Sequence, residues 1–172
     1  RELQRDPPKT LFNRFILATY PPASVFKAAQ GAVFLQENIV DVNTTFPCYH
    51  GFVVPGLRVG CHTHPSPVAF KGAISTSCNS YFCWGLYKMI DNRKYKSPAE
   101  ALTVWKDHMV SQGFGYALGV DLPGEKRGLI PNAQFYDKIY GEGKWNGLRI
   151  IHTAIGQGEI LLTPIQIANL SA

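Results

Sequence analysis

No apolar run in the sequence approaches the roughly 20 residues of a membrane-spanning helix, and no N-terminal signal peptide is present. The basic residues are scattered rather than gathered in a stripe, so a net charge of +5 gives little support to a nucleic-acid-binding role. Internal repeats and low-complexity segments are also lacking. With 172 residues, of which 45% are apolar and 17% charged, the composition is that of an ordinary globular chain, and we expect one domain with a sizeable core.

The most informative segment that is present begins at Pro21-Pro22, which forces an extended backbone before a helix. The helix is predicted from about Ser24 towards Asn38 and is apolar nearly all round, which indicates burial. Ser24 and Lys27 are three residues apart and therefore share one face. A desolvated lysine loses basicity and can take the proton of a neighbouring serine, making it a nucleophile. The alternative is a serine cap followed by a solvated lysine, the usual origin of a lone S-x-x-K.

A second motif, Ser77-Cys78-Asn79, has the form S-x-N, and each of the two motifs occurs once in the chain. S-x-x-K followed by S-x-N begins the active-site motif set of β-lactamases and penicillin-binding proteins, which a K-T-G motif completes. Taken alone, Ser77 and Asn79 are equally consistent with ordinary turn chemistry.

Further segments strengthen the resemblance: Asn13-Arg14, Thr19-Tyr20-Pro21-Pro22, Ser77 to Phe82, and Ile155 to Pro164. With these segments in register, the chain resembles part of the transpeptidase domain of a class B penicillin-binding protein of the elongation type, penicillin-binding protein 2. Ala23 departs from the usual glycine of the family, and Val25 replaces a common threonine. Neither change removes a catalytic group.

The resemblance implies a mainly α (α+β) fold, in which residues 1–172 form a partial transpeptidase domain. They would supply the helical lobe of the penicillin-recognising fold, with most of the central antiparallel sheet missing from this chain. Neither Lys9-Thr10 nor Lys96-Ser97 is followed by glycine, so the chain has no K-[S/T]-G motif. Residues 41–67, rich in proline and glycine, are expected to be an irregular insert of short strands and turns between the catalytic motifs.

Periodicity and capping signals predict the remaining elements. Ser97 and Glu100 form a capping box with proline between them, and Thr163-Pro164 opens a last helix that is expected to run to Ala172. The expected helices are 68–75, 80–90, 98–113 and 164–172. Residues 1–10 are a polar leading segment, 11–20 are weakly helical, 115–147 are surface loops with short extended pieces, and 150–155 are either strand or helix.

By the same resemblance, Ser24 attacks the carbonyl between the two terminal D-alanines of a peptidoglycan stem peptide and forms an acyl-enzyme. An amine from a neighbouring strand then completes the cross-link, and β-lactams acylate the same serine. Lys27 is the expected general base, Asn79 holds Lys27 and the substrate amide, and Ser77 relays a proton to the leaving nitrogen. No cofactor is required for this catalysis. The alternatives are a β-lactam sensor or β-lactamase-like hydrolase, and a non-catalytic scaffold of the elongation machinery.

The family also implies a location and partners. We expect a protein at the periplasmic face of the bacterial inner membrane, anchored by an upstream segment absent from this chain, with a glycosyltransferase of the elongation machinery as a partner. One oxyanion-hole donor would be the Ser24 N–H, and the other belongs to the strand that carries K-T-G. The chain is therefore expected to be inactive, or very slow, by itself.

Four cysteines, Cys48, Cys61, Cys78 and Cys83, allow three sets of disulfide pairings. An oxidising compartment permits disulfides, and Cys48–Cys61 is the simplest pair. Cys83 falls within a predicted helix and is expected in the core.

Zinc is the alternative to that disulfide. Some elongation-type members resemble one another in carrying zinc near the S-x-N loop, with the middle residue of the motif as a ligand. That residue is Cys78 here, and Cys48, Cys61 and His64 would complete a closed tetrahedral structural site. His62 or His50 could replace His64. Ligand type and the Cys61-x-x-His64 spacing favour zinc over the disulfide.

Overall fold

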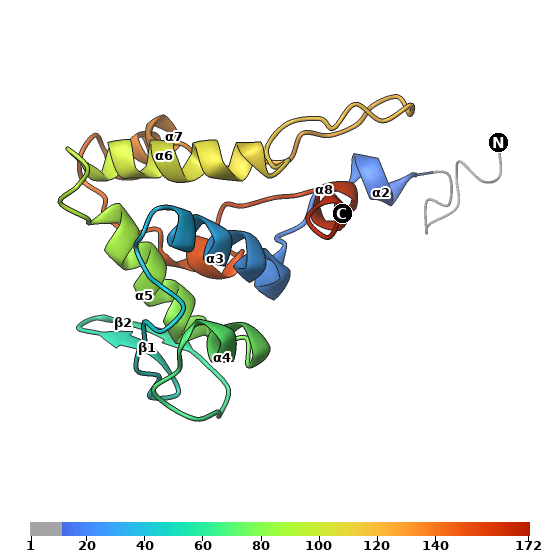
Figure 1. Cartoon of the computed structure of the whole chain (residues 1–172). Helices are drawn as coiled ribbons and strands as arrows, with labels where there is room; N and C mark the ends of the chain where they lie inside the picture. Colours follow the sequence, from blue (N-terminus) through green and yellow to red (C-terminus); the bar gives the residue numbers. More distant parts are fainter. Residues whose placement is uncertain (1–11) are drawn as a thin grey trace.

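The computed structural model describes residues 12–172, so the predictions for residues 1–10 lie outside the described part. Figure 1 shows α6 and α7 along the top, α3 and α5 in the middle, and a β-hairpin with α4 at the bottom. The elements are α2 Arg14–Leu17, η1 Ala23–Val25 (a 3-10 helix), α3 Phe26–Gln36, β1 Gly51–Val54, β2 Leu57–Gly60, α4 Phe70–Ser75, α5 Asn79–Ile90, α6 Pro98–Ser111, α7 Ala133–Tyr140, η2 Ile151–Ile155 (a 3-10 helix) and α8 Pro164–Asn169. Within residues 12–172 the only sheet is the two-stranded hairpin, which confirms a mainly helical lobe.

Helix α3 is buried on most sides, as its all-round apolar sequence predicts. Phe26, Val33 and Phe34 are each at most 1% exposed. The helix ends at Gln36, slightly before the predicted end. Asn38 takes the left-handed conformation (φ +54°), and the N–H of Ile39 donates to the Phe34 carbonyl at 2.9 Å. This is the Schellman termination, for which asparagine is suited because it tolerates positive φ.

Helix α5 is the centre of the core, since α3, α4, α6, the hairpin and η2 all pack against it. Gly85 lets α3 approach: a Cβ atom at this position would lie 2.4 Å from the ring of Phe34. Cys78 caps the start of α5, where its Sγ accepts the N–H of Tyr81 at 3.4 Å. Core packing thereby fixes the end of α5 at which the S-x-N motif lies.

Residues 41–67 contain the hairpin between irregular stretches, so the short strands predicted for this segment are present. Val54 pairs with Leu57 across a two-residue loop, Pro55-Gly56, and Gly56 has φ +77°. Proline followed by a glycine with positive φ is the pattern of a type II turn. An isolated bridge between Phe46 and Val68 brings the two ends of the segment together.

The prediction that residues 115–147 contain no helix is wrong, because α7 covers Ala133–Tyr140. Asn132 caps it by accepting the Phe135 N–H at 2.9 Å, and Gly141 with φ +96° ends it. A helix this short is stabilised by tertiary packing rather than by propensity. Here Tyr136 is fully buried, and the surrounding glycines masked that contact in the sequence.

The last helix is also shorter than expected. Thr163 and Gln166 form a complete capping box at its start, but α8 ends at Asn169 and does not continue to Ala172. The N–H groups of Ser171 and Ala172 bond to carbonyls three residues back, a tightening that is common where helices end.

Of the two alternatives predicted for residues 150–155, strand or helix, the helix is correct, because Ile151–Ile155 form the 3-10 helix η2. Within residues 12–172, no helix has the length and apolar character needed to cross a bilayer.

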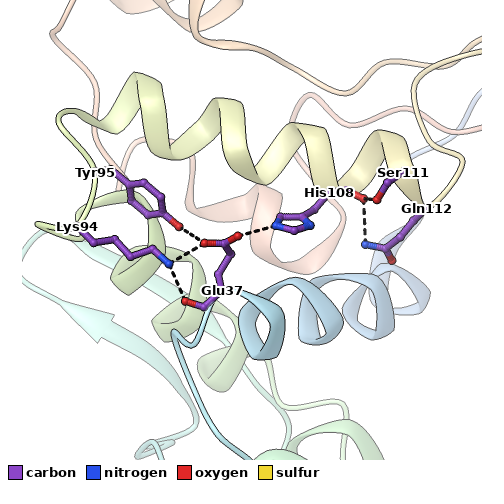
Figure 2. A network of polar contacts seen from close by, with 6 residues as sticks. All are labelled: Glu37, Lys94, Tyr95, His108, Ser111 and Gln112. Atoms are coloured by element: carbon purple, nitrogen blue, oxygen red, sulfur yellow. Dashed lines mark hydrogen bonds and ion pairs between the residues drawn. The ribbon is translucent and has the colours of Figure 1, made fainter.

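A polar network fastens the C-terminal end of α3 to α6 (Figure 2). The Glu37 carboxylate forms an ion pair with Lys94 at 2.6 Å, accepts the Tyr95 hydroxyl at 2.7 Å and lies 2.6 Å from Nε2 of His108. The hydrogen bonds from Lys94, His108 and Tyr95, in decreasing order of effect, lower the pKa of Glu37 to about 2. The network therefore stabilises the orientation of the helix whose other end carries the S-x-x-K motif.

Candidate active site and thiol cluster

The S-x-x-K motif lies where η1 passes into α3. Ala23 has φ +52°, an unusual conformation for a residue with a Cβ atom, and the turn that follows presents Ser24 to solvent. Lys27 is only 2% exposed, and its Nζ lies 3.2 Å from Ser24 Oγ. The sequence alternative of a serine cap followed by a solvated lysine is therefore wrong.

Lys27 Nζ is the point at which the two motifs meet. It lies 2.9 Å from Ser77 Oγ, 2.7 Å from the Ser77 carbonyl oxygen and 2.5 Å from Asn79 Oδ1, in addition to its 3.2 Å contact with Ser24 Oγ. A lysine amine has at most three hydrogens, so it donates to no more than three of these four oxygens at once. Burial lowers the pKa of Lys27, and the nearby Cys61, Cys78 and Cys83 thiols oppose this shift. A lysine whose charged form is disfavoured can accept a proton from a hydroxyl within hydrogen-bond reach.

Ser77 and Asn79 are held by the backbone around them. Ser77 lies between α4 and α5 with φ +50°, and Asn79 is the first residue of α5. The Asn79 amide donates to the Gly60 carbonyl at the end of β2, 2.7 Å away. The contact to Gly60 was not foreseen, because a backbone carbonyl leaves no residue-type signal in a sequence.

Gly156 supports the turn that carries Ser24. Its carbonyl accepts the N–H of Ala23 at 2.8 Å. A Cβ atom at Gly156 would lie 2.4 Å from the Ala23 carbonyl oxygen and 2.7 Å from Cβ of Phe26. Only glycine allows this approach, and its φ of +67° also favours glycine. The segment carried the family resemblance in the sequence, but its contact with the serine turn is visible only in the fold.

The structure also brings the predicted metal-ligating residues together. One ligand atom from each of Cys48, Cys61, His64 and Cys78 lies within 4.8 Å of every other. All the cysteines are free, so the Cys48–Cys61 disulfide is not formed. The two alternative histidines are outside this cluster, and Cys83 is buried in α5, as expected.

The donor set fits a tetrahedral zinc ion. His64 Nδ1 is 2.7 Å from the Pro65 carbonyl, a contact that makes Nδ1 the protonated nitrogen and leaves the Nε2 lone pair directed at Cys61 Sγ, 3.4 Å away. Burial opposes ionisation of Cys61, but the hydrogen bond that its sulfur accepts from the Asn79 N–H, together with the neighbouring His64 and Cys48 side chains, outweighs it and lowers the pKa of this thiol. Three sulfurs and one imidazole are ligands of structural zinc, whereas calcium and magnesium prefer oxygen.

Comparison with known proteins identifies the family. Residues 2–172 match the family described as "Penicillin binding protein transpeptidase domain", and the chain belongs to it. The resemblance drawn from the two motifs and the surrounding segments is thereby confirmed.

The particular relatives are of the penicillin-binding protein 2 type. The chain is similar to peptidoglycan D,D-transpeptidase MrdA of Acinetobacter baumannii, with 32% identity over 94% of this chain and 23% of the relative. It also matches a solved complex of PBP2 and MreC from Helicobacter pylori, with 30% identity, a TM-score of 0.80, and coverage of 96% of this chain and 29% of that one. A third match is to a peptidoglycan synthase complex described as coordinating polymerization and crosslinking, with 27% identity, a TM-score of 0.80, and coverage of 98% and 27%. The chain thus spans about a quarter of the length of its curated relatives.

Proposed function

We propose that this chain supplies the nucleophile and the proton-transfer groups of a peptidoglycan D,D-transpeptidase acting in cell-wall elongation. The observation that carries the proposal is the position of Lys27 Nζ, within hydrogen-bond reach of Ser24 Oγ, Ser77 Oγ and Asn79 Oδ1 at once. A scaffold without catalytic function has no need to bury a lysine against two hydroxyl groups, because the burial carries a desolvation cost.

Acylation would begin when Ser24 Oγ loses its proton to neutral Lys27 and attacks the carbonyl between the two D-alanines. The tetrahedral intermediate collapses with cleavage of the C–N bond, and the leaving amine receives the proton through Ser77 Oγ. Asn79 keeps Lys27 in place and presents its amide to the substrate. In deacylation the amine of a second stem peptide attacks the ester, its proton passes back through the same groups, and Ser24 regains its hydrogen.

The test is labelling by a fluorescent penicillin in the full-length protein. We expect one covalent adduct at Ser24 and none in Ser24→Ala. Lys27→Ala should also fail to label, because the hydroxyl then has no base. Ser75→Ala, which alters an exposed serine of α4, is the matched control and should label normally. Labelling that survives Ser24→Ala would overturn the proposal. Rapid hydrolysis of the adduct would favour the β-lactamase-like alternative.

We also propose that Cys48, Cys61, His64 and Cys78 bind one structural zinc ion. The supporting observations are the closeness of the four ligand atoms and the Nδ1 contact of His64. When bound, zinc would stabilise the thiolate forms and join the hairpin to the start of α5. It would take no part in the transfer of the acyl group.

The whole protein is proposed to act at the periplasmic face of the inner membrane, anchored by a segment outside this chain. β-Lactams, stem peptides and a glycosyltransferase of the elongation machinery are its proposed partners. The Helicobacter pylori relative has been solved in complex with MreC, and another relative as part of a peptidoglycan synthase complex. Co-purification of the full-length protein with such a glycosyltransferase would test this.

A further inference from the structure

The hydroxyl of Tyr136, in α7, joins two parts of the chain that are separated by a glycine turn. Tyr136 is fully buried, and its O–H donates to Glu159 Oε2 at 3.1 Å. The same oxygen lies 3.2 Å from Thr153 Oγ1. A phenol has one hydrogen, so the Thr153 hydroxyl is the donor in the second bond. Thr153 precedes the Gly156-Gln157-Gly158 turn and Glu159 follows it directly, so this single hydroxyl holds both ends of the turn.

The network reaches the catalytic helix through Gln30. The Gln30 amide donates to the Thr153 carbonyl at 2.9 Å, and its oxygen accepts the indole N–H of Trp105 at 2.7 Å. Gln30, Thr153 and Trp105 are all fully buried. Gln30 lies three residues after Lys27 in α3, on the same side of the helix. Every member of this buried network has a partner, a state in which polar groups specify one geometry.

The turn held in this way is the one that contacts the nucleophile's backbone. Gly156 accepts the Ala23 N–H at 2.8 Å and lies against the Ala23 carbonyl. Ala23 immediately precedes Ser24. A shift of the turn would therefore move Ser24 Oγ relative to Lys27 Nζ, which is itself fixed by Ser77 and Asn79.

We propose that Tyr136 and Glu159, assisted by Gln30, are positioning residues for acylation at Ser24. They do not touch the substrate in this proposal, which rests on the transpeptidase function proposed above. They keep the Gly156 turn in the place that sets the distance from Ser24 to Lys27. A displacement of about 1 Å in a reacting group can lower a rate by about a hundredfold, so loss of the Tyr136 hydroxyl should lower the maximal acylation rate by about tenfold.

The experiment measures acylation of the full-length protein by a labelled penicillin as a function of concentration. This separates the maximal acylation rate from the dissociation constant of the preceding complex. We expect Tyr136→Phe and Glu159→Ala each to lower the maximal rate about tenfold, with the dissociation constant unchanged. Glu159→Gln keeps an oxygen that accepts the phenol hydrogen and should retain most of the rate. The double variant Tyr136→Phe/Glu159→Ala should be no slower than the slower single variant, because both changes remove one shared bond.

Tyr140→Phe is the matched control. Tyr140 belongs to the same helix and stacks on Tyr136 at 6.2 Å, but its hydroxyl makes no hydrogen bond within residues 12–172. The maximal acylation rate of Tyr140→Phe should equal that of the wild type.

If Tyr136→Phe has a lower melting temperature but an unchanged maximal acylation rate, the network is purely structural and the inference is overturned. Equal losses of the maximal acylation rate in Tyr136→Phe and Tyr140→Phe would also overturn it. If Tyr136→Phe does not fold, the acylation rates of the Glu159 variants test the inference instead. Glu159 is only partly buried, so these variants are expected to fold. Failure of the wild type to label at Ser24 would instead refute the proposed function.

Discussion

Two residues of the candidate site have an unusual backbone conformation, one preceding the nucleophile and the other itself a candidate catalytic group. Ala23 (φ +52°) precedes Ser24, and Ser77 (φ +50°) begins the S-x-N motif. A left-handed conformation costs a residue with a Cβ atom about 1–2 kcal/mol, and such residues are concentrated at functional sites where the surrounding structure enforces them. At Ala23 the enforcing contact is the bond to Gly156. The glycine that the family resemblance leads us to expect at this position would adopt the same geometry without strain.

Ala23→Gly should therefore stabilise the protein. Relief of the left-handed strain outweighs the greater freedom of glycine in the unfolded chain, which costs about 0.5–1 kcal/mol. We expect a net gain of up to about 1 kcal/mol in the free energy of unfolding, measured by urea denaturation. Ala28→Gly, at an exposed position within α3, is the matched control and should lose about 1 kcal/mol. Equal losses in the free energy of unfolding of Ala23→Gly and Ala28→Gly would contradict this account of the turn.

At the scale of elements, the Glu37 network predicts a pH dependence of stability. The folded-state pKa of Glu37 is about 2 against an ordinary value of 4.5, because Lys94, His108 and Tyr95 hydrogen-bond its charged form. A depressed pKa contributes stability that is fully present above pH 4.5 and is lost as the pH falls from there towards 2. Solvent partly screens the group, so we expect this contribution to be about 1–2 kcal/mol.

Glu37→Gln should lower the free energy of unfolding at neutral pH by that amount and flatten its pH dependence between about pH 5 and pH 2. Urea denaturation at a series of pH values measures both effects. Glu142→Gln is the control, since Glu142 is exposed and has no ion pair within the described residues. An acid dependence as steep in Glu37→Gln as in the wild type would assign the effect to other carboxylates.

The thiol cluster connects elements in a similar way. Cys48 precedes β1, Cys61 follows β2 and Cys78 caps α5, so a shared ion would hold the hairpin against the S-x-N motif. Cys61 Sγ also accepts the N–H of Asn79 at 3.3 Å, which links the cluster to a candidate catalytic residue.

Protein prepared without chelator should contain about one zinc ion per chain by elemental analysis. Removing the zinc should lower the melting temperature by about 10 °C, because metal binding to such a site is coupled to folding. Each kcal/mol of lost stability lowers the melting temperature of a domain of this size by about 2–4 °C. Cys61→Ser should lose the metal, whereas Cys83→Ser should keep it, since Cys83 is outside the cluster. A Cys48–Cys61 disulfide found by mass spectrometry would refute the zinc proposal.

The sequence predicted those parts of the site that depend on local spacing or on ligand chemistry. Three residues of helix bring Lys27 to Ser24, and thiols with an imidazole indicated the cluster of Cys48, Cys61, His64 and Cys78. Beyond the contacts that the family resemblance implied, such as Asn79 to Lys27, it did not predict contacts that depend on the packing of distant segments. Gln30 and Thr153 are 123 positions apart, and neither carries a chemical signal that relates it to the other. Helix α7 was not predicted for the same reason, because it depends on the burial of Tyr136 by other segments of the chain.

At the scale of the whole molecule, the chain carries S-x-x-K and S-x-N but no K-[S/T]-G. We expect this chain to fold, because α3 packs on α5 and α6 without help from further strands. Its acylation by penicillin should be very slow, since removing one oxyanion-hole donor lowers rates roughly a hundred- to a thousandfold. The measurement compares this chain with a version extended through K-T-G. Equal rates would show that the third motif is unnecessary here.

The dependence of the serine turn on Gly156 and Thr153 has a consequence for biosynthesis. The Gln30–Thr153 hydrogen bond joins residues 123 positions apart. At about 5–20 residues per second, a ribosome needs roughly 6–25 s to extend the chain from one to the other. Throughout that interval the nucleophile has been made but the turn that orients it has not. The turn that orients Ser24 can therefore form only after the segment through Gly156 has been synthesised and has folded against Ala23.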